Sequence, residues 1–273
     1  MQNSNKSVKP NRGVILFAFN SPETNYVGIA DNAARLIKRY LNLPVTLVTD
    51  AVASPKFAYD VVHIVDTKDS NFRSNLDDVQ VQWKNFDRYL AYQFSPYEET
   101  ILLDTDYLVL DDSLLKLFET DFDYKLMHHN RDTNGPSFES MGTTSLPFVW
   151  ATVVLFRKTD RAKMLFDMVG RIQRNYHYYC QLYNISAGNY RNDYAFAIAN
   201  TVLSGYSLNE DQGIPWIMLT VEQRVESIHT KGSLLAVRMK DKAIVIPKQN
   251  VHVMDKDYLQ SKSFELFVEE MCV

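Results

Sequence analysis

Two carboxylates separated by one residue, Asp104 and Asp106, directly follow the apolar residues 101–103. In an extended segment, residues i and i+2 point to the same side, so both carboxylates can approach one cation or its water shell, and Thr105 faces the other way. Hard divalent cations prefer such oxygen ligands. The pair therefore predicts a metal site. The alternative is that the two aspartates solvate a turn or cap a following helix.

The segments before this pair predict a parallel sheet that would position it. Residues 14–19 are an apolar run typical of a central strand covered on both faces, and residues 45–49 and 61–65 have strand composition. Thr24 or Asn25 can cap an amphipathic helix between the first two strands. Strand, helix, strand in this order indicates an α/β fold, in which ligands bind beyond the carboxyl ends of the strands.

The remaining patterns predict a series of further elements. Trp83, Phe86, Leu90 and Phe94 have helical spacing, which would place Lys84 and Arg88 on one flank of a helix. The other expected elements are a fourth sheet strand at 101–104, a short helix at 112–118, a strand at 124–128, a long loop at 130–147, a strand at 149–156, a helix capped by Thr159 or Asp160, a buried helix at 192–203, strands at 234–239 and 243–246, and a terminal helix near 257–271.

Length and composition limit the class of protein. A chain of 273 residues that is 46% hydrophobic can form one large domain, expected at 13–273 after a flexible polar tail at 1–12. No apolar run has the length of a membrane span, and two cysteines form no disulfide framework, so we expect a cytoplasmic protein. The net charge of -4 gives no global attraction for nucleic acid. The sequence has no glycine-rich phosphate loop and no serine nucleophile motif, which disfavours nucleotide hydrolysis and esterase chemistry.

The string from Glu99 to Val109, an apolar strand interrupted by Asp-x-Asp, resembles the GT-A glycosyltransferases of the glycogenin and galactosyltransferase-like type. The resemblance extends loosely from Gly13 to about Lys256. It implies a Rossmann-like, mostly parallel sheet flanked by helices, with a smaller acceptor-side portion at the C-terminus. It also implies a hexosyl- or pentosyltransferase that binds a UDP-sugar donor together with Mn²⁺ or Mg²⁺ at the motif Asp104, Thr105 and Asp106.

The same resemblance implies roles for two residues late in the chain. His252 would be the third metal ligand beside the two aspartates, and Lys256 would meet the donor diphosphate. The glycine and tryptophan that usually follow the histidine in this family are absent here. A histidine between two valines is otherwise typical of a packed strand residue, and Lys256 could simply begin a solvated helix.

Further residues would contact the sugar or the donor if the resemblance holds. Lys84 or Arg88 would bind a phosphate or the sugar, unless they only form an exposed basic edge. Residues 190–194 are similar to the family's Asn-Asp-Gln segment, which makes Asp193 and Asn192 catalytic candidates; either could instead cap the helix that begins there. Trp150 and Thr152 replace the family's glycine pattern, which leaves the acceptor contacts open.

Residues 43–50 and the string Trp150-Ala-Thr are also similar to glycosyltransferases of tailed bacteriophages. Some phage transferases modify hydroxymethylated bases of their own DNA, so modified DNA in the host cytoplasm is one candidate acceptor. The basic residues at 157–174 and the segment 231–248 would have to bind it, although the first group is equally typical of a solvated helix face. The alternatives are a transferase acting on a protein, a glycan or a small molecule, and a non-catalytic nucleotide-sugar-binding module.

Overall fold

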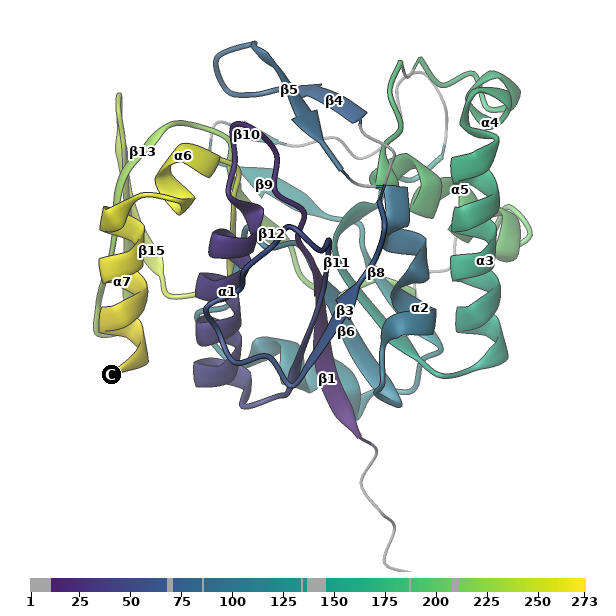
Figure 1. The fold of residues 1–273 in the computed structure, drawn as a ribbon. Helices are drawn as coiled ribbons and strands as arrows, with labels where there is room; N and C mark the ends of the chain where they lie inside the picture. Colours follow the sequence, from purple (N-terminus) through teal and green to yellow (C-terminus); the bar gives the residue numbers. More distant parts are fainter. Residues whose placement is uncertain are drawn as a thin grey trace, which may run out of the picture.

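A six-stranded sheet carries the acidic pair at the end of one of its middle strands (Figure 1). The computed structural model describes residues 11–67, 71–84, 86–133, 135–136, 146–186, 188–207 and 212–273. The strand order is β3-β2-β1-β6-β11-β8, and all of these strands run in parallel except β11. Their bounds are β1 Arg12–Phe17, β2 Val45–Thr49, β3 Val61–Ile64, β6 Glu99–Leu103, β8 Tyr124–Met127 and β11 Trp150–Arg157.

Helices flank this sheet, with α1 on one side and α2 and α3 on the other (Figure 1). Asn25 caps α1 by accepting a hydrogen bond from the backbone N–H of Gly28, and Thr159 caps α3 in the same way. The predicted α/β class, a mostly parallel sheet flanked by helices, is therefore confirmed. The helices are α1 Tyr26–Leu41, α2 Ala91–Phe94, α3 Asp160–Arg174, α4 Tyr176–Leu182, α5 Asn192–Leu203, α6 Lys256–Leu259 and α7 Lys262–Cys272, with 3-10 turns η1 Phe86–Leu90 and η2 Ser113–Glu119.

A second sheet, in the order β10-β9-β12-β16-β7, brings the late part of the chain to the acidic pair. β7 begins at the residue after Asp106 and pairs in antiparallel fashion with β16, so that His252 lies opposite Tyr107. The sequence did not predict this sheet. Its strands are β7 Tyr107–Leu108, β9 Asn130–Asp132, β10 Gly135–Pro136, β12 Met218–Val221 and β16 Val251–Val253.

The C-terminal part forms a second apolar core. Its three-stranded antiparallel sheet packs with α6 and α7. Ile29 and Leu36 from α1 join this core, while the other buried apolar residues of the helix belong to the core of the central sheet. The sheet contains β13 Val225–Lys231, β14 Leu234–Met239 and β15 Ala243–Pro247, and a separate hairpin contains β4 Asn71–Ser74 and β5 Gln80–Trp83. Within the described residues, no helix is both long enough and apolar enough to cross a bilayer.

Several local predictions need correction. Trp83 ends strand β5 rather than lying on a helix, and Lys84 comes before the 3-10 turn that contains Arg88, so the two residues share no helical flank. The expected loop at 130–147 contains β9 and β10, while residues 134 and 137–145 lie outside the described residues. The terminal helix is two helices, because Ser261 interrupts it and caps α7. Of the expected N-terminal tail, residues 1–10 lie outside the described residues, and Arg12 already belongs to β1.

Gly13 in β1 is needed because the ring of Tyr97 lies against its backbone. A β-carbon at residue 13 would lie 2.3 Å from ring carbon Cε2 of Tyr97, and that ring is buried with its hydroxyl accepting a hydrogen bond from Thr46 Oγ1 at 2.9 Å. We therefore expect Gly13→Ala to lower the free energy of unfolding by about 1–3 kcal/mol, the usual cost of overpacking. Urea denaturation measures it. Gly188→Ala, which meets no atom within 4 Å, should change it by less than about 0.5 kcal/mol.

Candidate metal and donor site

Asp104 and Asp106 lie in a tight turn between β6 and β7. The backbone N–H of Asp104 donates to Thr152 O at 2.9 Å, which ties the turn to β11, and the N–H of Tyr107 donates to Asp104 O at 3.2 Å, which closes the turn. The two carboxylates therefore converge because the chain turns here, not because the segment is extended. Thr105 is buried and is one of the residues that line the same cavity.

His252 reaches this turn from β16. The N–H of Val253 donates to Asp106 O at 2.9 Å, and His252 Nε2 lies 3.4 Å from Asp106 Oδ2. One potential ligand atom from each of Asp104, Asp106 and His252 lies within 4.8 Å of the others. The expected ligand set is thus brought together, and its histidine is a buried strand residue, so the packed-strand and ligand interpretations are compatible.

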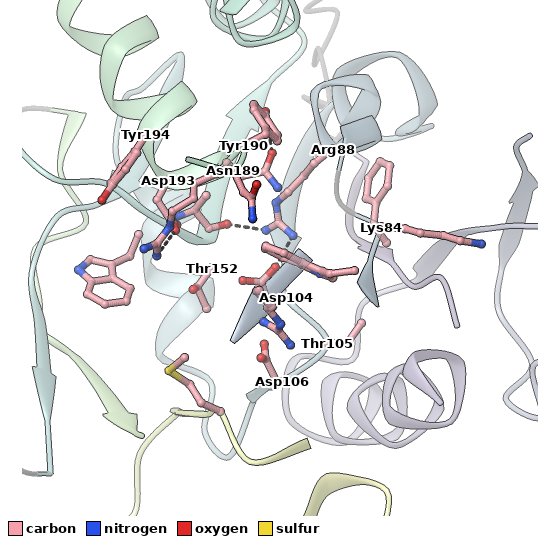
Figure 2. A pocket seen from close by; sticks show the side chains of 18 of the residues that line it. Lys84, Arg88, Asp104, Thr105, Asp106, Thr152, Asn189, Tyr190, Asp193 and Tyr194 are labelled. Atoms are coloured by element: carbon pink, nitrogen blue, oxygen red, sulfur yellow. Dashed lines mark hydrogen bonds and ion pairs between the residues drawn. The ribbon is translucent and has the colours of Figure 1, made fainter. Parts of the chain in front are cut away.

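Two cations hold the aspartates in place. The guanidinium of Arg88 forms an ion pair with Asp104 and also donates to the carbonyl oxygen of Ala151, and Figure 2 shows it pointing at Asp104. The ammonium of Lys256 forms an ion pair with Asp106. Each carboxylate therefore has its own basic partner, supplied by η1 in one case and by α6 in the other.

These contacts shift the acidities of the cluster in opposite directions. Burial raises the pKa of Asp104; Arg88 opposes the shift, whereas the negative charges of Asp106 and Asp193 add to it. Burial would also raise the pKa of Asp106, but the positive charge of Lys256, together with the nearby His252, outweighs it and holds that pKa well below its usual value. Burial lowers the pKa of Lys256. The site therefore favours an ionised Asp106.

The donor atoms fit a divalent cation. Asp106 Oδ1 is buried and has no hydrogen-bond partner among the described residues, and an unpaired buried carboxylate oxygen is costly unless something positive contacts it. Two carboxylates and one imidazole suit Mn²⁺, and carboxylates with water suit Mg²⁺. Asp104, Asp106 and His252 would hold the ion.

Asp193 and Asn192 line the same cavity. Asp193 Oδ1 accepts from the N–H of Ala151 at 2.9 Å, and its other oxygen pairs with Arg191 at 3.1 Å. The N-cap residue of α5 is Arg191, which makes no side-chain cap bond, so the helix-capping alternative is wrong for both residues. Asn192 is buried and accepts a hydrogen bond from the hydroxyl of Tyr190 at 3.0 Å.

Lys84 lines the cavity but is turned to another carboxylate. Its ammonium lies 2.8 Å from Asp50 Oδ2 at the end of β2, and Figure 2 shows the side chain running away from Asp104 and Asp106. Neither Lys84 nor Arg88 forms the exposed basic edge that the sequence left open, because both are paired with carboxylates. Of these two residues, only Arg88 contacts the acidic pair Asp104 and Asp106.

These residues surround one cavity of about 530 Å³. Its walls come from the ends of β1 and β6, from β11, from the start of α5, from the β4–β5 hairpin and from the segment after β16. A volume of this size is typical of a small-molecule site. Tyr26, Arg73 and Trp83 also line this cavity, and the sequence did not indicate a site role for any of them because they belong to no recognised motif.

Some of the basic residues that would have to bind DNA already have partners within the chain. Arg157 pairs with Glu99 and Asp121, Lys163 pairs with Asp167, and the ammonium of Lys158 donates to the carbonyl oxygen of Tyr92. In the second segment, Arg238 pairs with Glu226 and Lys242 donates to Thr133 O. The charges of the described residues therefore give the DNA acceptor no added support, and it stays a prediction.

No family of known proteins matches the sequence, and no curated protein matches it. Solved structures that resemble the chain include the glycosyltransferase GlyE of Streptococcus pneumoniae TIGR4, at 14% identity and a TM-score of 0.43 over 74% of this chain and 44% of that one. The galactosyltransferase LgtC with donor and acceptor sugar analogs is similar at 15% identity and a TM-score of 0.45, over 70% of both chains. Mouse xyloside xylosyltransferase 1 is similar at 12% identity and a TM-score of 0.44, over 72% of this chain and 84% of that one. The chain thus spans less than half the length of GlyE.

Proposed function

We propose that this chain is a metal-dependent glycosyltransferase of the GT-A type, which transfers a sugar from a UDP-sugar to an acceptor hydroxyl. The observation that carries the proposal is the convergence of Asp104, Asp106 and His252 in a cavity of about 530 Å³. The Asp-x-Asp motif and its place after a central parallel strand support it, because ligands of open α/β sheets bind beyond the carboxyl ends of the strands.

The residues around the cavity have separable roles in this proposal. Mn²⁺ or Mg²⁺ held by the two aspartates and His252 would neutralise negative charge on the leaving diphosphate. Lys256 and Arg88 would stabilise the same charge, since both lie directly beside the acidic pair. Asp193 would orient sugar hydroxyls or stabilise positive charge at the anomeric carbon, with Asn192 beside it.

We propose that the acceptor is a compound that carries a free hydroxyl group. Hydroxymethylated bases of phage DNA remain one candidate, and a protein, a glycan or a small molecule is the alternative. Binding to duplex DNA that weakens steeply with salt would favour the first. A non-catalytic nucleotide-sugar-binding module is the rival outside enzymes, and Mn²⁺-dependent hydrolysis of a UDP-sugar without acceptor would exclude it.

A screen of nucleotide-sugars by thermal shift, with and without Mn²⁺, tests the proposal. A ligand that binds only the folded chain raises its stability by about 2.7 kcal/mol at a hundredfold excess over Kd. We expect UDP-sugars to raise the melting temperature only when Mn²⁺ is present. If neither Mn²⁺ nor any nucleotide-sugar changes the melting temperature, the proposal is wrong.

Thr220 should control how well His252 binds the metal. The Thr220 hydroxyl donates to Asn130 Oδ1 at 2.6 Å, so its oxygen is left to accept from His252 Nδ1, 3.4 Å away. A proton on Nδ1 leaves Nε2, the nitrogen that faces Asp106, free to bind a cation. We expect Thr220→Val to weaken Mn²⁺ binding by about 10-fold or more, as loss of such supporting contacts typically does.

Isothermal titration with Mn²⁺ in the absence of nucleotide measures this effect. Thr220→Ser is the matched variant, because it keeps the hydroxyl and loses only a methyl group, and it should bind Mn²⁺ like the unmodified chain. Equal Mn²⁺ affinities for Thr220→Val and Thr220→Ser would show that the hydroxyl does not orient His252.

A further inference from the structure

The β4–β5 hairpin lies over one end of the central sheet (Figure 1), and residues of both of its strands line the cavity. Several bonds fix its position. Asn71 Nδ2 donates to Tyr190 O at 2.6 Å, and Asn189 Nδ2 donates to Phe72 O at 2.8 Å. At the turn of the hairpin, Asp77 forms an ion pair with Arg224. These contacts hold the hairpin at its first strand and at its turn, so the position of a side chain that points from it into the cavity is fixed.

Arg73 is that side chain, and two aromatic residues orient it. Its Nη2 donates to the hydroxyl of Tyr26 at 2.7 Å, and its guanidinium carbon lies 4.7 Å from the centre of the Trp83 ring. All three residues line the cavity. Stacking and one hydrogen bond use only part of a guanidinium, which has five N–H donors. The remaining donors of Arg73 are therefore available to a ligand.

Arg73 differs from the other basic residues of the cavity in its charge balance. Lys84 pairs with Asp50, Arg88 with Asp104, Lys256 with Asp106 and Arg191 with Asp193. Over the part of the chain that the structure describes, Arg73 forms no ion pair with a carboxylate. A guanidinium held in place inside a cavity without an anionic partner is suited to an anionic ligand, and its planar fork matches phosphate in particular.

The position of Arg73 relative to Lys256 indicates where that anion would lie. Arg73 and Lys256 both line the cavity, so their two positive charges face the same space. Lys256 contacts Asp106 on the metal side, whereas Arg73 reaches in from the hairpin. An anion between them would relieve the repulsion of these two cations.

We propose that Arg73 binds a phosphate group of the donor nucleotide from the hairpin side, opposite the acidic cluster. This inference rests on the proposed function. It assigns a donor-binding residue that neither the Asp-x-Asp motif nor the basic residues 84 and 88 indicate. It also predicts that the affinity supplied by Arg73 depends on the phosphates of the ligand and not on its base.

Calorimetric titration of UDP, UMP and uridine, each with Mn²⁺ present, tests this on the full chain and on Arg73→Gln. We expect Arg73→Gln to weaken the binding of UDP by about 10–100-fold, the range for loss of a charge-assisted hydrogen bond. The affinity for uridine should change by less than about 2-fold. Arg73→Lys keeps the positive charge but loses the planar guanidinium, so its affinity for UDP should lie between those of the unmodified chain and Arg73→Gln. Arg171→Gln, on an exposed arginine of α3 that does not line the cavity, is the matched control.

The outcomes separate this inference from the function on which it rests. If the unmodified chain binds no nucleoside diphosphate with Mn²⁺, both are wrong. If it binds UDP and Arg73→Gln binds UDP equally well, only the inference is wrong. Equal losses for UDP and uridine would also overturn it, since Arg73 would then act on the base. The melting temperature of Arg73→Gln checks that any loss is not caused by unfolding.

Discussion

Replacing Asp106 with asparagine is expected to abolish the Mn²⁺-dependent thermal shift and to lower the rate of sugar transfer by about 10³-fold. Asparagine keeps the size of the side chain but removes the negative charge that a divalent cation requires. A divalent cation would stabilise the negative charge that develops on the leaving diphosphate by several kcal/mol. Each 1.36 kcal/mol corresponds to a tenfold change in rate. Steady-state transfer to an acceptor, or hydrolysis of the UDP-sugar, measures the loss.

The same substitution also disturbs the protein without metal. Lys256 is buried, with 11% of its side chain exposed, and Asp106 is its ion-pair partner. Removing one partner of a buried pair typically costs about 3–5 kcal/mol because the other charge stays uncompensated. A loss of activity in Asp106→Asn could therefore come from instability as well as from loss of the metal.

The double variant Asp106→Asn with Lys256→Met separates the two causes. Both charges of the pair are then absent, so much of the lost stability should return, whereas the response to Mn²⁺ should not. Urea denaturation without metal measures the first effect and titration with Mn²⁺ the second. A double variant that binds Mn²⁺ as tightly as the unmodified chain would place the metal elsewhere.

The first half of the central sheet could be predicted because its signals are local. The apolar run of β1, the cap at Asn25 and the amphipathic face of α1 are continuous in the chain, and each element follows from its own residues. The same holds for Thr159 and α3. Asp104 and Asp106 could be placed at the end of a strand for the same reason, although the turn that makes them converge could not.

The position of His252 could be expected only from the family resemblance. β16 has three residues, which is too short for a recognisable alternation, and it pairs with β7, which has two. Its pairing with Tyr107 joins residues far apart in the chain. No spacing in the sequence encodes such a contact, because it depends on how β9, β12 and β16 assemble next to the central sheet.

Lys84, Arg88 and Arg73 show where reasoning from spacing goes wrong. Lys84 and Arg88 are four residues apart, which suggested a common helix face, but the chain leaves β5 at Trp83 and begins a 3-10 turn only at Phe86. Arg88 is therefore buried against Asp104, whereas Lys84 turns to Asp50. Arg73 lies on a four-residue strand of a short hairpin, and its importance depends on Tyr26 and Trp83, which only the folded chain brings to it.

Replacing Arg88 with methionine should destabilise the chain without metal by about 1–3 kcal/mol, the usual cost of leaving a partly buried polar group without its partner, and Mn²⁺ should restore part of this loss. Arg88 is 6% exposed and joins Asp104 to the carbonyl oxygen of Ala151. Without it, Asp104, whose side chain is 36% exposed, loses its basic partner and keeps the like charge of Asp106 beside it, and both the partial burial and the like charge are unfavourable. A divalent cation at this site would supply the missing positive charge, so the stabilisation by Mn²⁺ should be larger in the variant than in the unmodified chain.

Lys84→Met is the matched control for this argument. It also removes a basic partner from a carboxylate at the end of a strand, since Lys84 pairs with Asp50 after β2. Asp50 does not belong to the Asp104, Asp106 and His252 cluster, so Mn²⁺ should not offset the stability lost in Lys84→Met. Melting temperatures of both variants with and without Mn²⁺ measure the difference. Equal responses to Mn²⁺ in the two variants would mean that the ion does not interact with Asp104, because only that carboxylate loses its partner in Arg88→Met.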